Sequence, residues 1–280
     1  MPLSDGRRTH NRRGTAIRHR RFALERQPPQ WLEVGKGSSR RLAFLLQEGE
    51  GAPVVWLGGF RSDMRATKAE ALADWARASG RACLRFDYGG HGESDGDFGD
   101  FTLSDWLGDA LAMIESQCRQ RPILVGSSMG GWIALLAARR LLGTALQPAG
   151  LVLIAPAVDF SEELMWAQMP DSIRRTILDE GVWLRPSEYS PEPTPITRAL
   201  IEDGRRHLMF GGEIKAGCPV HILQGMRDPD VPWLQALKLV EHLSGDPVVL
   251  TLVKDGDHRL SSPADIARLQ AAVAGVATAS

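Results

Sequence analysis

The stretch RPILVGSSMGGWIALLAARR, residues 121 to 140, decides the fold of this chain. A short apolar run leads into a turn of glycines and serines, and small apolar residues at helical spacing follow. This order predicts a buried strand, a sharp turn and a helix that packs closely on the strand. Gly126 and Gly130 flank Ser128 in a G-x-S-x-G pattern, which is typical of a nucleophile elbow that exposes one serine at the edge of a sheet.

Two other serines compete with Ser128 for this role. Ser127 occupies the variable place before it, and Ser94 is the centre of a second match, GESDG at residues 92 to 96. The second match follows a loop rather than a strand, and the acidic, glycine-rich residues after it cannot open a well-packed helix. We therefore expect Ser128 to be the nucleophile and Ser94 to be a loop residue.

Strand and helix patterns alternate along most of the chain after residue 40. Strand patterns cover residues 41–47, 53–60, 81–88, 122–126 and 150–157, and recur in PVHILQGMRD and VVLTLVKDGDH. Helix patterns cover residues 66–79, 102–118 and 129–142, and a helix follows each of the two later strands. Strands separated by helices predict an α/β fold with a mostly parallel central sheet and helices on both faces.

Residues 158 to 217 interrupt this alternation. They show no clean strand, and prolines recur through them. Apolar residues from Phe160 to Ile177 lie mostly three or four positions apart, which is helical spacing. Because a structureless loop of this length would be unusual in a compact domain, we predict one domain over residues 31–280 with a helical cap inserted at about residues 158–217.

The N-terminal segment differs from the rest of the chain in charge. The whole chain has 33 Lys and Arg against 34 Asp and Glu, a formal net charge of −1, while residues 1–26 hold eight arginines against Asp5 and Glu25. We expect residues 1–30 to form a basic, mostly disordered tail. The alternatives are an organelle transit peptide, a nucleic-acid contact and a wrongly assigned start codon; the segment lacks the apolar core of a secretory signal.

Composition narrows the class of protein further. The chain holds no run of about 18 apolar residues, so we expect no membrane span. The three cysteines, Cys83, Cys118 and Cys218, are odd in number and form no C-x-x-C pair, which predicts free thiols in a reducing compartment. We expect a cytoplasmic protein of bacterial type without a nucleic-acid partner, and organelle targeting by the basic tail is the alternative.

A serine nucleophile needs a base, and the base needs an acid that orients it. After a nucleophile elbow on a parallel sheet, the acid and then the histidine follow later strands. His258 comes directly after the last strand pattern and before the final helix, so it is the predicted base. Asp228 follows the preceding strand and is the favoured acid, with Asp230 as the alternative. Asp257 is predicted to be a turn residue.

Acyl transfer also needs two backbone N–H donors for the oxyanion. The amide of Met129, directly after the nucleophile, is one predicted donor. The second comes from the loop after the strand pattern at residues 53–60, where Phe60 is favoured and Gly59 is the alternative. Chemistry of this kind needs no metal or organic cofactor, and we expect none.

Several motifs together resemble a known family. They are GGFRSDMRATKAEAL, RACLRFDYGGHGESDG, ILVGSSMGGWIALLAA, GVWLRPSEYS, QGMRDPDVPW and DGDHRL. The set is similar to the α/β-hydrolase-domain family of the mitochondrial palmitoyl-protein thioesterase, also called mycophenolic acid acyl-glucuronide esterase, and its bacterial relatives. The similarity covers roughly residues 40 to 275, so it is far more specific than G-x-S-x-G alone. It implies the α/β-hydrolase fold, the catalytic set Ser128, Asp228 and His258, and Phe60 and Met129 as oxyanion donors.

The resemblance implies a serine hydrolase that cleaves carboxylic esters or thioesters of a small molecule or an acylated protein. The cap residues Met165, Trp166, Met169 and Trp183 are candidates for an acyl pocket, and they would equally serve to seal the cap against the sheet domain. An acyltransferase and a proline-type peptidase are alternatives on the same triad. A non-catalytic ligand-binding protein is a further alternative, because fold alone does not establish activity.

Overall fold

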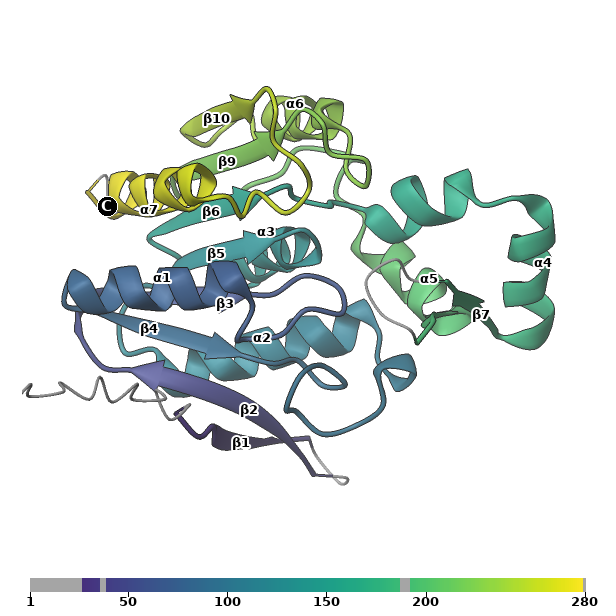
Figure 1. The fold of residues 1–280 in the computed structure, drawn as a ribbon, viewed down its shortest axis with the longest axis horizontal. Helices are drawn as coiled ribbons and strands as arrows, with labels where there is room; N and C mark the ends of the chain where they lie inside the picture. Colours follow the sequence, from purple (N-terminus) through teal and green to yellow (C-terminus); the bar gives the residue numbers. More distant parts are fainter. Residues whose placement is uncertain (1–26, 36–38, 187–191, 279–280) are drawn as a thin grey trace, which may run out of the picture.

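The computed structural model describes residues 27–35, 39–186 and 192–278. These residues form a central sheet with helices on both faces and a cap at one end (Figure 1). The predicted α/β fold with a mostly parallel sheet is therefore confirmed. Residues 1–26, most of the predicted basic tail, lie outside the described residues. None of the helices in the described ranges is long and apolar enough to cross a membrane.

The central sheet has eight strands in the order β1-β2-β4-β3-β5-β6-β9-β10. They are β1 (Gln30–Val34), β2 (Arg40–Gln47), β3 (Glu50–Leu57), β4 (Arg81–Phe86), β5 (Ile123–Ser127), β6 (Gly150–Ile154), β9 (Val220–Gly225) and β10 (Val248–Val253). Neighbours from β4 to β10 pair in parallel, whereas β1 and β2 extend one edge in antiparallel pairs. The carboxyl ends of the parallel strands therefore meet at one edge, where loops from distant parts of the sequence can share a site.

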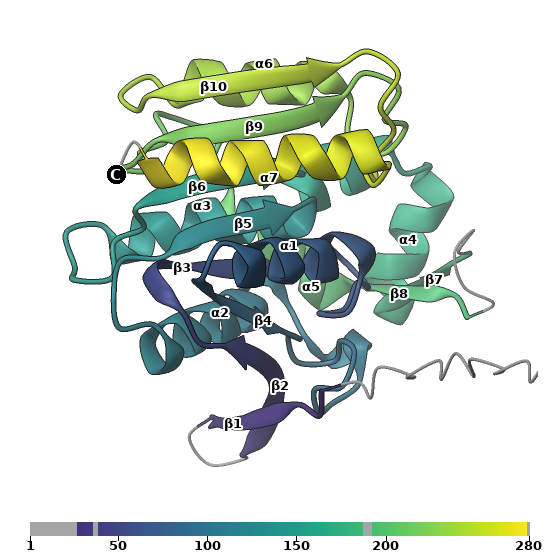
Figure 2. The same cartoon turned by 60° about the vertical axis from the view of Figure 1, so that its left-hand side comes forward.

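Helices cover the sheet in two layers. They are α1 (Thr67–Ala78), α2 (Leu103–Gln117), α3 (Met129–Leu141), α6 (Trp233–His242) and α7 (Pro263–Thr278), with a short 3-10 turn at Phe98–Asp100. Helices α1 and α7 lie on one face of the sheet, and α2, α3 and α6 lie on the other (Figures 1 and 2). This arrangement buries both faces of the parallel strands.

Alternate side chains of each strand enter the two layers, as the two-residue period of a strand requires. In β3, Val54 and Trp56 join the apolar core under α1 and α7, while Val55 and Leu57 join the core under α2 and α3.

The three cysteines also lie in the interior. All three are buried free thiols, and burial raises the pKa of each to about 12. They contribute packing and stay protonated.

The segment between β6 and β9 forms the cap. It contains a π-helical turn (Ser161–Met165), 3-10 turns at Trp166–Gln168 and Arg205–His207, and helices α4 (Asp171–Glu180) and α5 (Arg198–Gly204). It also contains strands β7 (Val182–Arg185) and β8 (Thr194–Thr197), which pair antiparallel. The expectation that this segment has no strand is therefore wrong. Each strand is only four residues long, and Pro195 in β8 obscured the pattern because proline is rare inside strands.

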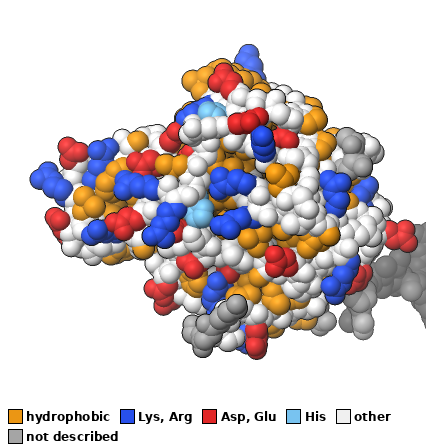
Figure 3. Space-filling view, turned by 180° about the vertical axis from the view of Figure 1, so that it is seen from behind, with side chains coloured by type: hydrophobic (Ala, Val, Ile, Leu, Met, Phe, Trp, Pro, Cys, Tyr) orange, Lys and Arg blue, Asp and Glu red, His pale blue; other side chains and the backbone are white. Residues whose placement is uncertain are grey.

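Polar contacts join the cap to the sheet domain. Ser104, at the start of α2, donates its hydroxyl to Asp203 of α5 over 2.8 Å and lies 2.7 Å from His207 Nε2. Burial, opposed by Asp203, lowers the pKa of His207, and nearby arginines lower it further. Figure 3 shows Lys and Arg side chains gathered at this junction. The neutral histidine can therefore serve as a hydrogen-bond donor that links the two parts.

Glycines allow β5, α3 and β3 to approach one another at the elbow. A Cβ on Gly126 would clash with the backbone of Gly130, and a Cβ on Gly130 would clash with the carbonyl of Leu57. A Cβ on Gly131 would lie 2.9 Å from Pro156 Cβ. The glycines of the motif are thus required by backbone packing between three elements.

This packing predicts the effect of adding one methyl group. Gly130→Ala should lower the free energy of unfolding by about 3 kcal/mol, because the new Cβ meets backbone atoms that cannot move aside alone. Gly108→Ala in α2 is the matched control, since its Cβ would meet no atom within 4 Å. The control should raise stability by about 0.5–1 kcal/mol. Urea denaturation of both variants measures the difference, and equal stabilities would contradict the packing argument.

Candidate active site

Ser128 lies at the turn between β5 and α3. Its backbone has φ 55° and ψ −119°, a strained conformation that costs on the order of 1–3 kcal/mol. The Ser128 amide donates to the Ile154 carbonyl over 2.8 Å, and the Ser128 carbonyl accepts from the amides of Gly131 and Ala157. Hydrogen bonds on both sides therefore hold the strained residue in place.

His258 links Ser128 to Asp228. His258 Nε2 lies 3.2 Å from Ser128 Oγ, and His258 Nδ1 lies 2.7 Å from Asp228 Oδ2. The Asp228 side chain is fully buried, whereas that of His258 is 24% exposed. Because an ionised carboxylate only accepts hydrogen bonds, Nδ1 carries a proton and Nε2 can accept one from the serine. Three residues far apart in the sequence thus form one hydrogen-bonded chain.

Further hydrogen bonds hold the Asp228 carboxylate. Its Oδ1 accepts from the amides of Asp230 and Val231, each over 2.8 Å, and its Oδ2 accepts from Gln224 Nε2 over 3.2 Å. Gln224 is fully buried at the end of β9 and was not predicted. The available signal was a polar amide in an otherwise apolar strand, since buried polar groups are almost always hydrogen-bonded. Asp230, the alternative acid, contributes its backbone amide to Asp228.

Asp228, Asp230 and His258 also bring three potential metal ligands together. One ligand atom from each lies within 4.8 Å of the others. Both oxygens of Asp228 and Nδ1 of His258 already take part in the hydrogen bonds described above. These bonds account for the cluster, and we assign no metal site to it.

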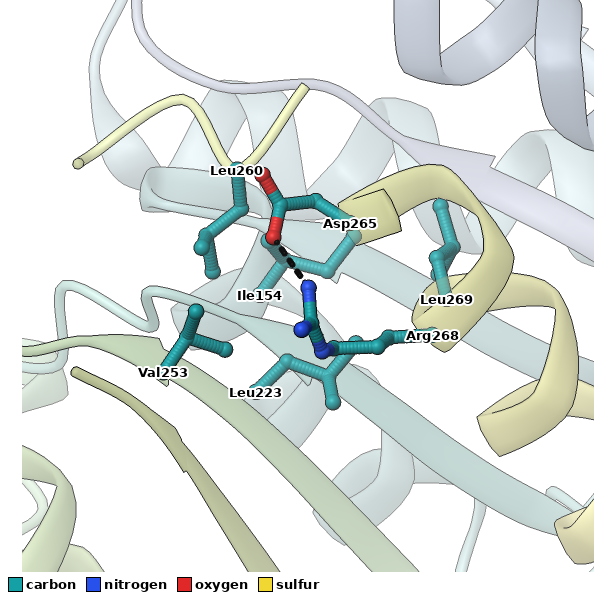
Figure 4. Close-up of a pocket in the computed structure, with 7 residues that line it drawn as sticks. All are labelled: Ile154, Leu223, Val253, Leu260, Asp265, Arg268 and Leu269. Atoms are coloured by element: carbon teal, nitrogen blue, oxygen red, sulfur yellow. Dashed lines mark hydrogen bonds and ion pairs between the residues drawn. The ribbon is translucent and has the colours of Figure 1, made fainter. Parts of the chain in front are cut away.

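Two contacts anchor the loop that carries His258. Leu260, two residues further on, is buried and lines a small cavity together with residues of β6, β9, β10 and α7, among them the ion pair of Asp265 and Arg268 (Figure 4). On the other side, Lys68 of α1 donates from its ammonium group to the Arg259 carbonyl. Burial lowers the pKa of Lys68 to about 8. Lys68 was not predicted, because nothing in a helix pattern indicates a partner so distant in the sequence.

The turn after β3 runs beside Ser128, the predicted nucleophile. A Cβ on Gly59 would lie 3.4 Å from Ser128 Cβ, so the turn passes close beside the serine. The Ser62 amide donates to the Gly59 carbonyl over 3.0 Å and closes the turn. Within the described chain, the amides of Phe60 and Met129 donate to no protein acceptor. Both predicted oxyanion donors are therefore unpaired. The Met129 amide is free because Met129 is the first residue of α3, and the first amides of a helix have no intrahelical acceptor.

The loop after β4 contacts the same turn and its continuation. His91 Nε2 accepts from the Arg61 amide over 3.3 Å, and Asp87 Oδ1 accepts from the Met64 amide over 2.6 Å. Burial lowers the pKa of His91 to about 4 and raises the pKa of Asp87 to about 6. Neither side chain was among the predicted site residues.

The competing serines have different surroundings. Ser94 donates its hydroxyl to the Asp87 carbonyl over 2.7 Å and accepts from the Ala43 amide over 2.8 Å. It therefore connects the loop after β4 to strand β2 and has no part in the chain formed by His258. Ser127 is buried as the last residue of β5.

The four predicted pocket residues of the cap lie together. Met165, Trp166, Met169 and Trp183 are partly buried and pack around a small apolar cluster of Ile177, Ile196 and Ile201. Phe60, from the turn beside Ser128, packs against the same cluster. The apolar interior of the cap thus continues to the turn beside Ser128. Their role in binding an acyl group stays a prediction.

The fold and the site together define the class of protein. A parallel sheet with a nucleophile elbow after β5, and with an acid and a histidine after later strands, is the arrangement of the α/β hydrolases. The model of the alpha/beta hydrolase family matches residues 51–269, and the chain belongs to this family.

Individual relatives narrow the comparison. Human mitochondrial palmitoyl-protein thioesterase ABHD10 is 33% identical over 254 residues, which is 87% of this chain and 82% of that protein. The structure of alpha/beta hydrolase domain-containing protein 10 from mouse has a TM-score of 0.79 at 30% identity and covers 88% of this chain and 98% of its own. The crystal structure of a putative hydrolase from Agrobacterium vitis S4 has a TM-score of 0.85 at 49% identity. The match covers 89% of this chain and 98% of that one. The resemblance and the prediction of an enzyme that hydrolyses ester bonds are confirmed at the level of the family.

The buried His91, beside the turn after β3, predicts part of the acid sensitivity of the fold. In the native state His91 stays neutral down to a pKa of about 4, whereas the unfolded chain binds a proton near pH 6.5. Because the unfolded chain binds this proton more readily than the native state, the free energy of unfolding decreases as the pH falls from about 6.5 to 4. His91→Gln, which cannot titrate, should show a smaller fall in Tm between pH 7 and pH 4.5 than the unchanged protein.

Thermal unfolding followed by circular dichroism measures this difference. Arg61, which faces His91, and the nearby Asp87 are common to both proteins, so their own contributions cancel in the comparison. Identical pH profiles for the two proteins would contradict the assignment of a buried, neutral His91.

Proposed function

We propose that this enzyme cleaves carboxylic esters or thioesters through an acyl-enzyme on Ser128, with His258 as the base and Asp228 as the acid that orients it. The observation that carries the proposal is the hydrogen-bonded chain from Ser128 Oγ through His258 to the buried carboxylate of Asp228. Its position at the carboxyl ends of parallel strands, beside an apolar cap, supports the same conclusion.

The first half of the reaction forms the acyl-enzyme. Ser128 Oγ attacks the carbonyl carbon while His258 Nε2 takes the hydroxyl proton. Asp228 stabilises the imidazolium from 2.7 Å. His258 then gives its proton to the departing alcohol or thiol. In the second half, the same histidine activates a water molecule, which releases the carboxylic acid and restores the serine.

Phe60 and Met129 are the proposed donors to the oxyanion. Each tetrahedral intermediate carries its negative charge on the former carbonyl oxygen, and fixed backbone amides stabilise that charge without reorganisation. The two amides make no hydrogen bond elsewhere in the described residues, and Gly59, next to Phe60, lies so close to Ser128 that an added Cβ would be 3.4 Å from the serine Cβ. The Gly59 amide likewise donates to no protein acceptor in the described ranges, so the preference for Phe60 over Gly59 rests on the family resemblance.

The proposed substrate is an acyl ester or thioester of a small molecule or a protein, with its acyl chain against Met165, Trp166, Met169 and Trp183. Partly buried apolar side chains that continue from the cap to Phe60 offer a surface for such a chain. The curated relatives are named palmitoyl-protein thioesterases. The same names include mitochondrial, which favours the alternative of organelle targeting, while a cytoplasmic location stays our prediction.

Substitution of the nucleophile tests the reaction. Ser128→Ala should lower kcat on p-nitrophenyl butyrate and on palmitoyl-CoA by about 10⁴-fold or more, because no other group can form the acyl-enzyme. Ser127→Ala is the matched control and should keep most of the activity. Turnover and labelling by a fluorophosphonate probe are measured on both variants, and full activity in purified Ser128→Ala protein would overturn the proposal.

Enlarging one cap residue tests the acyl pocket. Met165→Trp should lower kcat/KM for p-nitrophenyl decanoate relative to butyrate by about tenfold, because the larger ring occupies space for the distal methylenes. Leu178→Trp is the control, since Leu178 is 44% exposed on α4. An unchanged ratio in both variants would show that these side chains only seal the cap.

A further inference from the structure

The turn that carries Phe60 depends on a side chain from another loop. Gly59 to Ser62 form a four-residue turn, closed by the bond from the Ser62 amide to the Gly59 carbonyl. Arg61, its third residue, has φ 61°. Turns with positive φ at this place normally hold glycine or asparagine there. An arginine in this conformation persists only if neighbouring groups hold it.

The middle peptide of such a turn can stand in two orientations. In one it directs the Arg61 N–H to a given side, and in the other it directs the Phe60 carbonyl to that side, as in type II and type I turns. His91 Nε2 lies 3.3 Å from the Arg61 nitrogen and accepts its hydrogen bond. The opposite orientation would set the lone pair of the Phe60 oxygen against that of Nε2. His91 thus selects one orientation of the turn.

The surroundings of His91 make it a dedicated acceptor. Its Nδ1 lies 3.3 Å from the Gly89 carbonyl, which can only accept, so the proton is on Nδ1 and the lone pair is on Nε2. The ring is 4% exposed and makes edge-to-face contacts with Tyr88, Phe98 and Trp106. Burial keeps the ring neutral, since it lowers the pKa of His91 to about 4. At neutral pH, Nδ1 therefore donates to the Gly89 carbonyl and Nε2 accepts from the Arg61 amide.

The same aromatic group also holds the Phe60 side chain. The Phe60 ring lies 4.8 Å from that of Phe98 and 5.9 Å from that of Trp106, both edge-to-face. Its backbone and its side chain are thus fixed by one cluster centred on His91. The mechanism described above uses neither His91 nor Trp106.

We propose that His91 is a positioning residue for the oxyanion hole: it holds the Gly59–Ser62 turn in place through the Arg61 amide and so fixes the position of the Phe60 backbone, whose amide is the proposed oxyanion donor. The assignment rests on the proposed function of Ser128 and adds a requirement of its own. If the assignment is right, the position of Nε2 must hold a hydrogen-bond acceptor, and a ring that only fills the same space is not enough.

Two variants separate the acceptor from the ring. His91→Phe keeps an aromatic ring and removes the acceptor, whereas His91→Gln can place its Oε1 near the position of Nε2. His91→Phe should lower kcat on p-nitrophenyl butyrate by about 10- to 100-fold with little change in KM, because a displaced donor weakens the transition state most. His91→Gln should stay within about threefold of the unchanged enzyme. His91→Leu serves as a second variant without an acceptor if His91→Phe does not fold.

The specific readout is inhibition by an alkyl trifluoromethyl ketone, which forms a tetrahedral oxyanion on the serine. The inhibition constant should rise in His91→Phe by the same factor as kcat/KM falls, and should change little in His91→Gln. Equal losses in both variants, or unchanged inhibition in His91→Phe, would overturn the role of His91. Absence of Ser128-dependent turnover in the unchanged enzyme would instead overturn the proposed function, and the assignment with it.

Discussion

The close approach of three backbones at the elbow is the constraint on which the rest of the site depends. Gly126 and Gly130 let β5, α3 and the end of β3 come within distances that any side chain would prevent, and Gly131 allows α3 to approach Pro156 after β6. This contact sets the strained conformation of Ser128 and brings Gly59 against it. The same backbone packing therefore positions both the proposed nucleophile and the turn that carries a proposed oxyanion donor.

Around this contact, each loop at the carboxyl edge is held by hydrogen bonds from another loop or strand. Gln224 and two backbone amides hold Asp228, which in turn bonds His258. Lys68 holds the backbone after His258. The geometry of the site is therefore a property of several loops together, and buried polar groups are the means of fixing it.

Much of the fold and of the candidate site could be predicted because its signals are local. The glycine spacing and the apolar run at residues 123–125 predict the elbow. The order of the later strands predicts that Asp228 and His258 follow it. The cap was predicted less well, since the four-residue strands β7 and β8 stabilise each other by pairing and carry little pattern of their own. Edge strand β1 went unpredicted for the same reason.

By itself, the sequence determined the alternation of strands and helices, the position of the elbow and the preference for Ser128 over Ser94. Periodicity, glycine spacing and motif context are encoded within a few neighbouring residues. Only the tertiary structure decided that Asp228 rather than Asp230 bonds His258, and that Gln224, Lys68 and His91 support the site. Hydrogen bonds between distant loops depend on how the whole sheet assembles, and no local pattern records which partners that assembly brings together.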